Sequence, residues 1–434
     1  MTEPNLSSSD ICREDLVKEM PFLHSGRRRF LFREAWLNQR DSGGHTPLHW
    51  AAAFGDLQAV RRLLHLGASA NGKSRERWTP LHFAAWYGRS RASRMLLAHG
   101  ARVNARDDLG QTSLDFAVSW AHFALAADLI AHGAKANACH WAAMGRLREL
   151  RTLLDSNPKA VQARLAQGES PLHLAIRFGH NAVARHLLSG GAEMECRDKQ
   201  GRTPLHWAAL GGLARGASLL IRHGADVNTH DHEGDSPLHY AAACGENRAA
   251  EILKLESLLD SEIDRSETPR FPIWTPELIF RYSQTAEILI DGGADPEMRC
   301  GHGESPLHRA AWAGAHGMVR VLLDRAPNPN AATRYGWTPL HIACLRADVA
   351  TAKALLEKGA NPNLQARAHR DWFPMADKPD FCGTALHLAF RCGPPRLVCL
   401  LRAHGADPLI RDERGRLPSE GNGRRRRRKP AEGL

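Results

Sequence analysis

The stretch DKQGRTPLHWAALGGLARGASLLIRHGADVN, residues 198–228, decides the fold because it encodes two short helices and the turns that end them. Thr203 supplies a capping oxygen, and Pro204 follows at the first helical position, where its missing N–H costs nothing. Gly211 and Gly224 stand where the two helices should end, because glycine tolerates a left-handed stop. Apolar residues recur at helical spacing before Gly224, and a polar turn with Asp and Asn follows.

This pattern returns through most of the chain at a period of 33 residues. Thr-Pro-Leu-His begins at residues 46, 79, 203 and 338, Ser-Pro-Leu-His begins at 170, 236 and 305, and weaker copies begin at 112, 137, 384 and 417. Seven of the ten intervals are 33, and the others are 25, 69 and 46, which indicates one shortened repeat and two insertions. Two short helices cannot bury their apolar faces alone, so we expect consecutive copies to stack.

The pattern Asp-x-x-Gly-x-Thr-Pro-Leu-His-x-Ala-Ala, followed by Gly and then Leu-Leu-x-x-Gly-Ala-Asp-x-Asn, resembles the ankyrin-repeat family. The resemblance covers roughly residues 40–420. It implies an all-α ankyrin-repeat solenoid of stacked helix pairs with β-hairpin fingers. It also implies a protein that binds other proteins on a concave surface, through finger tips and inner helices, without chemistry in the repeats.

We therefore predict three regions. Residues 1–40 form an N-terminal segment whose amphipathic stretch 30–37 caps the array, residues 41–420 form an array of about eleven repeats, and residues 421–434 form a disordered basic tail. The copy at Asn137 lacks its finger, which predicts a notch in the finger row. The last copy, at Leu417, suits a polar terminal cap.

Two insertions interrupt the array, near residues 256–283 and 366–380. The first is either a long surface loop or a degenerate extra repeat that starts at Thr275, and the second helix of its copy lies at 249–255 or at 285–290. The second insertion falls where a finger belongs and should lengthen it.

Composition excludes several classes of protein. Hydrophobic residues make up 43% of the chain and charged residues 24%, as in ordinary globular proteins. No apolar run is long enough to span a membrane, and the first residues lack the pattern of a secretory signal. Nine scattered cysteines favour a reducing compartment, so we expect an intracellular protein, cytoplasmic or nuclear. The net charge is +11, of which residues 424–429 supply six, so we expect the basic character mainly in the tail.

No catalytic or metal site is expected. Nine histidines share the place after Pro-Leu or its equivalent, where the family resemblance implies hydrogen bonds within the turn and to the next repeat; they are His49, His82, His140, His173, His206, His239, His308, His341 and His387. The group Cys382, His387, Cys392 and Cys399 lacks the paired spacing of zinc ligands. Phosphate-loop, zinc-protease and hydrolase signatures are missing, so we predict a non-enzyme without cofactor, metal or small-molecule substrate.

Aromatic residues are the candidates for partner binding. One set follows the capping position (Trp50, Phe83, Phe116, Trp141, Trp207 and Tyr240) and is expected to pack helix against helix. A second set stands where the family exposes side chains, and its predicted partner-binding residues are Phe54, Trp78, Trp86, Tyr87, Trp120, Phe178, Trp312, Tyr335 and Trp337. Trp372 and Phe373 in the second insertion are either further anchors or fold back onto adjacent fingers. Charged neighbours mix both signs, which disfavours a phosphate-binding groove.

The function predicted first is a monomeric scaffold or adaptor that binds partner proteins on the finger and inner-helix surface. The alternative is a nuclear or nucleic-acid-associated factor that uses the basic tail, Arg424, Arg425, Arg426, Arg427, Arg428 and Lys429. Such a tail attracts nucleic acid only non-specifically, because no aromatic platforms accompany it. A substrate adaptor or secreted effector is a third possibility.

Overall fold

The computed structural model describes residues 37–243, 276–325, 328–367 and 382–422. These residues fall into two compact units: unit 1 contains residues 37–193, and unit 2 contains the described residues from 194 onward. Residues 30–36 of the predicted capping stretch 30–37 lie outside the described residues, but Leu37 at its end is buried. No helix in the described ranges is long and apolar enough to cross a membrane.

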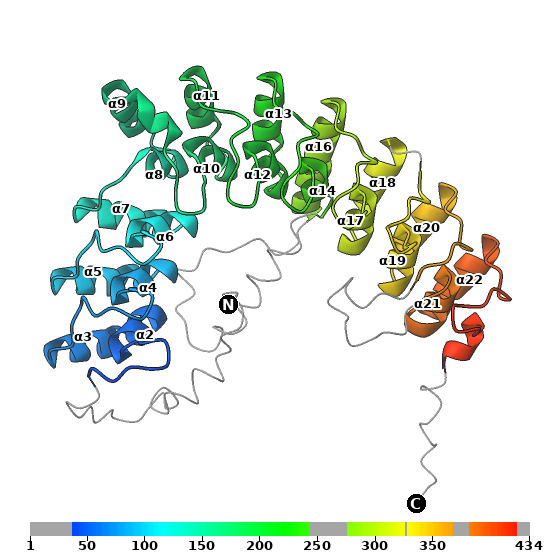
Figure 1. The fold of residues 1–434 in the computed structure, drawn as a ribbon, viewed down its shortest axis with the longest axis horizontal. Helices are drawn as coiled ribbons and strands as arrows, with labels where there is room; N and C mark the ends of the chain where they lie inside the picture. Colours follow the sequence, from blue (N-terminus) through cyan, green and yellow to red (C-terminus); the bar gives the residue numbers. More distant parts are fainter. Residues whose placement is uncertain (1–36, 244–275, 326–327, 368–381, 423–434) are drawn as a thin grey trace, which may run out of the picture. The chain divides into compact units, whose positions relative to one another are not determined.

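Unit 1 is built from helix pairs in two rows. Its helices are α2 (Pro47–Phe54), α3 (Leu57–His65), α4 (Pro80–Trp86), α5 (Ser90–Ala98), α6 (Ser113–Ser119), α7 (Phe123–Ala131), α8 (Ala138–Ala143), α9 (Leu147–Ser156), the 3-10 helix η3 (Pro158–Gln162), α10 (Pro171–Arg177) and α11 (Asn181–Ser189). The first helices of successive pairs pack side by side, as α2, α4 and α6 do, and the second helices α3, α5 and α7 form a parallel row (Figure 1).

Unit 2 repeats the same construction. Its helices are α12 (Pro204–Leu210), α13 (Ala214–Arg222), α14 (Pro237–Ala242), α16 (Pro276–Asp291), α17 (Pro306–Ala313), α18 (His316–Arg325), α19 (Pro339–Leu345), α20 (Val349–Glu357), α21 (Ala385–Cys392), α22 (Pro395–Ala403) and the 3-10 helix η4 (Pro418–Asn422). The first-helix row runs through α12, α14, α17, α19 and α21, and η4 packs against α21 at its end.

Local sequence explains where the helices begin and end. Thr79 adopts an extended backbone before Pro80, and α4 is followed by Gly88 in the left-handed conformation, with φ of 68°. The second helix of that pair buries Leu96 completely and is followed by Gly100, with φ of 81°. Positive φ is cheap only for glycine, so the recurring glycines fix the direction of the chain after each helix.

The fingers between pairs are tight turns. In the finger of residues 107–111, Asp107 N–H donates to the Gln111 carbonyl at 3.0 Å, and Gly110 N–H donates back to Asp107 at 3.2 Å. Within the described residues no β-strand forms, and one isolated antiparallel bridge joins Ala366 to Gly383. The helical solenoid is therefore as predicted, while the β-hairpins are not confirmed, because each turn offers too few backbone pairs for a ladder.

The shortened copy replaces its missing finger with side chains. Asn137 caps α8 by accepting from the N–H groups of Cys139 and His140, at 2.9 and 3.2 Å. Asp115 takes the place that histidine has in most copies, and its carboxylate accepts from His140 Nε2 at 2.9 Å. In most other copies this imidazole nitrogen donates to a backbone carbonyl of the following finger, for example from His82 to Gln111, whereas His140 donates back to the preceding helix α6.

The insertions lie mostly outside the described residues. The helix α16 runs without a break from Pro276 to Asp291, so residues 285–290 lie within it and no turn divides 276–291 into the two helices of a separate repeat. The other candidate, 249–255, lies outside the described residues, as do 368–381 of the second insertion.

Candidate partner-binding surface

The nine repeated histidines all make the same hydrogen bond within their own repeat. Each Nδ1 accepts from the backbone N–H of the residue that caps its helix, for example Thr79 to His82 at 3.0 Å. In seven of the copies the opposite nitrogen donates to the next finger, as His49 Nε2 does to the Trp78 carbonyl at 3.0 Å. These hydrogen bonds are as predicted, and they use both ring nitrogens for holding the fingers in place.

Burial keeps most of these imidazoles neutral. It lowers the pKa of His49, His82, His206, His239 and His341 to about 4 and that of His308 to about 3. A neutral ring with one donor and one acceptor is what the two contacts require. The row therefore serves the fold.

The first aromatic set also serves the fold, in a way that the sequence analysis missed. Trp50 and Trp207 donate their indole N–H to Asp41 and Asp198 of their own fingers at 3.0 and 3.1 Å, and Tyr240 donates its hydroxyl to Asp231 at 2.7 Å. Each donor lies nine residues after its acceptor, so an Asp nine positions before an aromatic residue is the signal. These hydrogen bonds attach each of the three fingers to the helix that follows it.

Three tryptophans of the second aromatic set gather around Phe116 of the first set in unit 1. We call Trp78, Trp86, Phe116 and Trp120 the aromatic cluster. Ring centroids lie 4.7 Å apart for Trp78 and Phe116, 5.2 Å for Trp78 and Trp86, and 5.1 Å for Trp86 and Trp120. The three tryptophans are half-buried, so part of each ring is exposed along the fingers and first helices of consecutive repeats.

Two further predicted residues lie beside this cluster. Tyr87 and Trp78 pack against the buried group of Trp50 and Phe83, and the ring of Phe54 stacks on Trp50 at 6.2 Å. Phe54 is 36% exposed, one of few large apolar side chains so open among the described residues. Unit 1 therefore brings five of the predicted residues into one neighbourhood.

The remaining predicted residues do not join such a cluster. Phe178 packs against Phe123 at 5.1 Å under the Arg177 guanidinium, and Trp312 lies under that of Arg346. Tyr335 is half-buried on its finger. Trp372, Phe373 and the tail 424–429 lie outside the described residues.

The predicted exposure of Trp337 is wrong. Its side chain is buried at 4% exposure, and its indole N–H donates to the Arg367 carbonyl at 3.1 Å. The N–H of Arg367 donates in turn to the Tyr335 carbonyl at 2.8 Å, so the tryptophan helps to join residues 335–337 to Arg367.

The basic residues are not concentrated in the tail, contrary to the prediction. Residues 37–193 of unit 1 hold 19 Lys and Arg against 11 Asp and Glu, so a basic excess of eight lies outside the tail. The whole-chain sum conceals it because acidic residues elsewhere offset it. At the finger beside Trp78, the exposed residues Lys73, Arg75 and Arg77 face a single acidic neighbour on that finger, Glu76.

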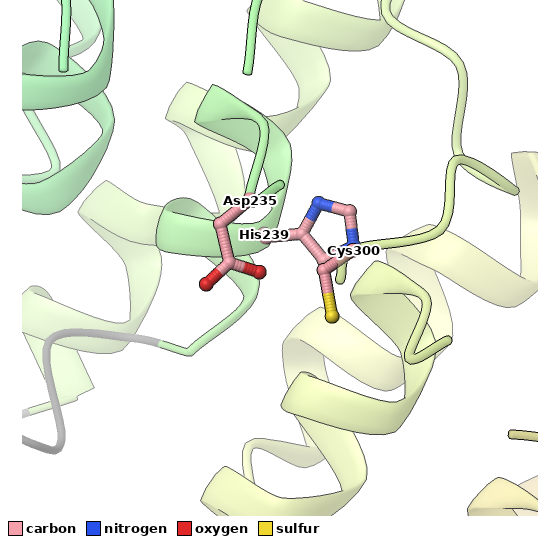
Figure 2. A group of neighbouring side chains, drawn as sticks. All are labelled: Asp235, His239 and Cys300. Carbon is pink, nitrogen blue, oxygen red and sulfur yellow. The ribbon is translucent and has the colours of Figure 1, made fainter. Parts of the chain in front are cut away.

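Unit 2 contains one group of metal-ligand type among the described residues, Asp235, His239 and Cys300 (Figure 2). Their ligand atoms lie within 4.8 Å of one another, and all three residues are buried. His239 has no nitrogen to spare, because Nδ1 accepts from Ser236 N–H at 3.1 Å and Nε2 donates to the Glu304 carbonyl at 3.1 Å.

A cation already belongs to this group. The Arg309 guanidinium donates to Asp235 at 3.1 Å, and its Nε lies 2.9 Å from the Glu304 carboxylate, although that N–H is not directed along a hydrogen bond. Burial raises the pKa of the Cys300 thiol, which disfavours the thiolate that metals bind. The residues therefore fit a metal ion poorly and fit a buried ion pair well.

Comparison with known families agrees with this architecture. Models of three consecutive ankyrin repeats match residues 27–107, 73–139, 114–198, 182–265 and 279–366, and a single-repeat model matches 383–413. The chain belongs to the ankyrin-repeat family. Ankyrin repeats are general protein–protein interaction modules and are typically not enzymes. No curated protein matches the chain.

Within this ankyrin-repeat protein, repetition separates two kinds of residue. Residues present in nearly every copy, such as His82 and its equivalents, make contacts within and between repeats and so serve the fold. The three tryptophans of the aromatic cluster differ from copy to copy and keep exposed surface. The exposed surface beside Trp78, Trp86 and Trp120 is therefore the candidate site.

Proposed function

We propose that this ankyrin-repeat protein is a non-enzymatic scaffold or adaptor that binds a partner protein at the aromatic cluster of unit 1. The observation that carries the proposal is the run of half-buried tryptophans, Trp78, Trp86 and Trp120, with ring centroids 5.1–5.2 Å apart along the run. Tryptophan is among the residues that most often dominate binding energy at interfaces.

Rigid display supports the same proposal. The rings come from a finger and from the ends of α4 and α6. The finger is held by His49, α4 is capped with His82, and α6 is capped with Asp115. Side chains already packed in one arrangement lose little conformational entropy on binding. An intracellular location and a monomeric state are part of the proposal. The seven described cysteines form no disulfide bond and five of them are buried, which suits a reducing compartment.

Affinity capture with matched variants tests the proposal. The double variant Trp86→Ala/Trp120→Ala removes the exposed edge of the cluster, whereas Trp312→Ala/Tyr335→Ala removes two aromatic residues of unit 2 that do not cluster. We expect the first variant to lose the proteins that the wild type captures and the second to retain them. Circular dichroism confirms that both variants stay folded.

Loss of the partner in the unit 2 variant alone would contradict the proposed site. Deleting 424–429 distinguishes this proposal from the nuclear or nucleic-acid alternative. Binding through the aromatic cluster should persist without the tail and at high salt, whereas binding through the tail should be lost in both cases. A captured protein that depends on the tail alone would favour the alternative.

A further inference from the structure

The finger tip beside the aromatic cluster contains a strained residue. Arg77 has φ of 60°, in the left-handed region, at the turn position where comparable fingers carry glycine, such as Gly44 and Gly110, each with φ of 78°. The turn is otherwise the same: Arg77 N–H donates to the Ser74 carbonyl at 3.1 Å, as Gly44 N–H does to Asp41 at 2.9 Å. A Cβ atom destabilises this conformation, so glycine would fit the turn better.

Among the described residues, the side-chain contact of Arg77 is weak. The Arg77 side chain is 54% exposed, and its Nε lies 3.8 Å from the carboxylate of Asp108, which is 52% exposed. An exposed pair at this distance contributes little to stability. Backbone strain retained without a structural benefit is characteristic of functional positions.

The finger tip nevertheless has a fixed backbone. Arg75 N–H donates to the Gly43 carbonyl at 2.9 Å, and the Glu76 carbonyl accepts from Asp108 N–H at 3.2 Å, so neighbouring fingers hold it from both sides. Arg77 is thus displayed from a rigid frame, one residue before Trp78 of the aromatic cluster.

Resting on the proposed function, we infer that the partner is an extended acidic peptide segment, in which a carboxylate pairs with Arg77 and an adjacent apolar side chain packs on Trp78 and Trp86. A guanidinium recognises a carboxylate through two parallel hydrogen bonds, which gives direction as well as affinity. The basic excess of residues 37–193 attracts an acidic segment from a distance.

A nucleic acid fits this finger tip less well. Evenly spaced phosphates would meet Glu76 and Asp108 together with Arg77, whereas a peptide places a single carboxylate where it is needed. The cluster rings are also tilted against each other, by 46° for Trp78 and Trp86, and half-buried, so they offer no open face on which bases would stack.

A displayed library of random peptides, selected on the full chain, identifies the probe for the test. We expect the selected peptides to contain Asp or Glu next to Leu, Phe or Trp. Affinities are then measured by titration calorimetry for one selected peptide and for its amide analogue, in which Glu becomes Gln or Asp becomes Asn. The wild type should bind the acidic peptide about tenfold more tightly than the amide analogue, which corresponds to about 1.4 kcal/mol.

Variants of Arg77 decide the role of this residue. Arg77→Gly should melt no lower than the wild type, because it relieves the strain, and should bind both peptides equally. Arg77→Lys retains the charge but not the planar fork, so its preference for the acidic peptide should be smaller. Ala121→Gly, which replaces another left-handed residue of unit 1 with φ of 61°, is the matched control and should bind as the wild type does.

The outcomes separate this inference from the proposed function. Selected peptides that require Trp86 but are unaffected by Arg77→Gly, or that lack acidic residues, overturn the inference and leave the proposed function standing. Failure to select any peptide that requires Trp86 overturns both. Displacement of the peptide by oligo-dT at physiological salt would instead favour a nucleic acid.

Discussion

The finger tip at Arg77 in unit 1 and the buried group around Arg309 in unit 2 use the same amino acid in opposite ways. Arg309 is largely buried between two carboxylates, with 22% of its side chain exposed. Arg77 is mostly exposed, paired only at 3.8 Å, and held in a strained backbone. The comparison teaches that a closely paired, buried charge serves the fold, whereas an exposed and weakly paired charge on a fixed frame is available to a partner.

The largest expected effect is loss of stability in acid, concentrated in unit 2. Four of its histidines have pKa values of about 3 to 4 when folded, against two such histidines in unit 1. Unfolded imidazoles bind protons near pH 6.5, and the folded ones bind them only near pH 4. The stabilisation is therefore complete above pH 6.5 and falls by several kcal/mol as the pH drops toward 4.

Urea unfolding at pH 7, 6 and 5 measures the free energy of unfolding. Hydrogen exchange at the same pH values measures which amides open first. We expect the free energy of unfolding to fall with pH and the amides of unit 2 to open before those of unit 1. A His308→Asn variant should show a shallower pH dependence. Constant stability between pH 7 and 5 would contradict the histidine argument.

The next effect is loss of the buried cation. Arg309→Met leaves the carboxylates of Asp235 and Glu304 buried without a counter-charge, and we expect a loss of about 3–5 kcal/mol in the free energy of unfolding. Adding Asp235→Asn and Glu304→Gln should restore much of it. Urea denaturation measures both, and Arg320→Met on the exposed face of α18 is the control, with a change within about 0.5 kcal/mol.

A small effect of Arg309→Met would mean that water reaches Asp235 and Glu304, and it would remove the contrast with Arg77. The effect should also shrink in acid, because burial already raises the pKa of Asp235 and protonation removes the unpaired charge.

The repeated part of this fold is predictable from sequence because repetition averages out local ambiguity. One Thr-Pro-Leu-His is a weak signal, but eleven copies, most of them 33 residues apart, together predict where the helices start and end and which contacts the histidines make. What appears once is not predictable in this way. The exchange of histidine for Asp115 beside the missing finger, and the burial of Trp337 under Arg367, both depend on which neighbour a finger meets.

The candidate site was predictable only in part. Position in the repeat indicated Trp78, Trp86 and Trp120, but not that they form a cluster while Trp312 and Tyr335 do not. Arg77 was missed although its signal is in the sequence: it occupies a place that the repeat gives to glycine. A departure from the repeat at a position with a backbone requirement indicates function better than residue type alone.

The smallest expected effect tests whether such departures cost stability wherever they occur. Ala121 in unit 1 and Ala347 in unit 2 occupy glycine positions after a first helix, with φ of 61° and 59°. Replacing either by Gly relieves left-handed strain of about 1–2 kcal/mol but adds freedom to the unfolded chain, so we expect a gain of about 0.5–1 kcal/mol. Urea denaturation of Ala121→Gly and Ala347→Gly should give similar gains, because the two turns have nearly the same φ. A loss at both positions would mean that positive φ carries no cost here, and Arg77 would then no longer stand out as strained.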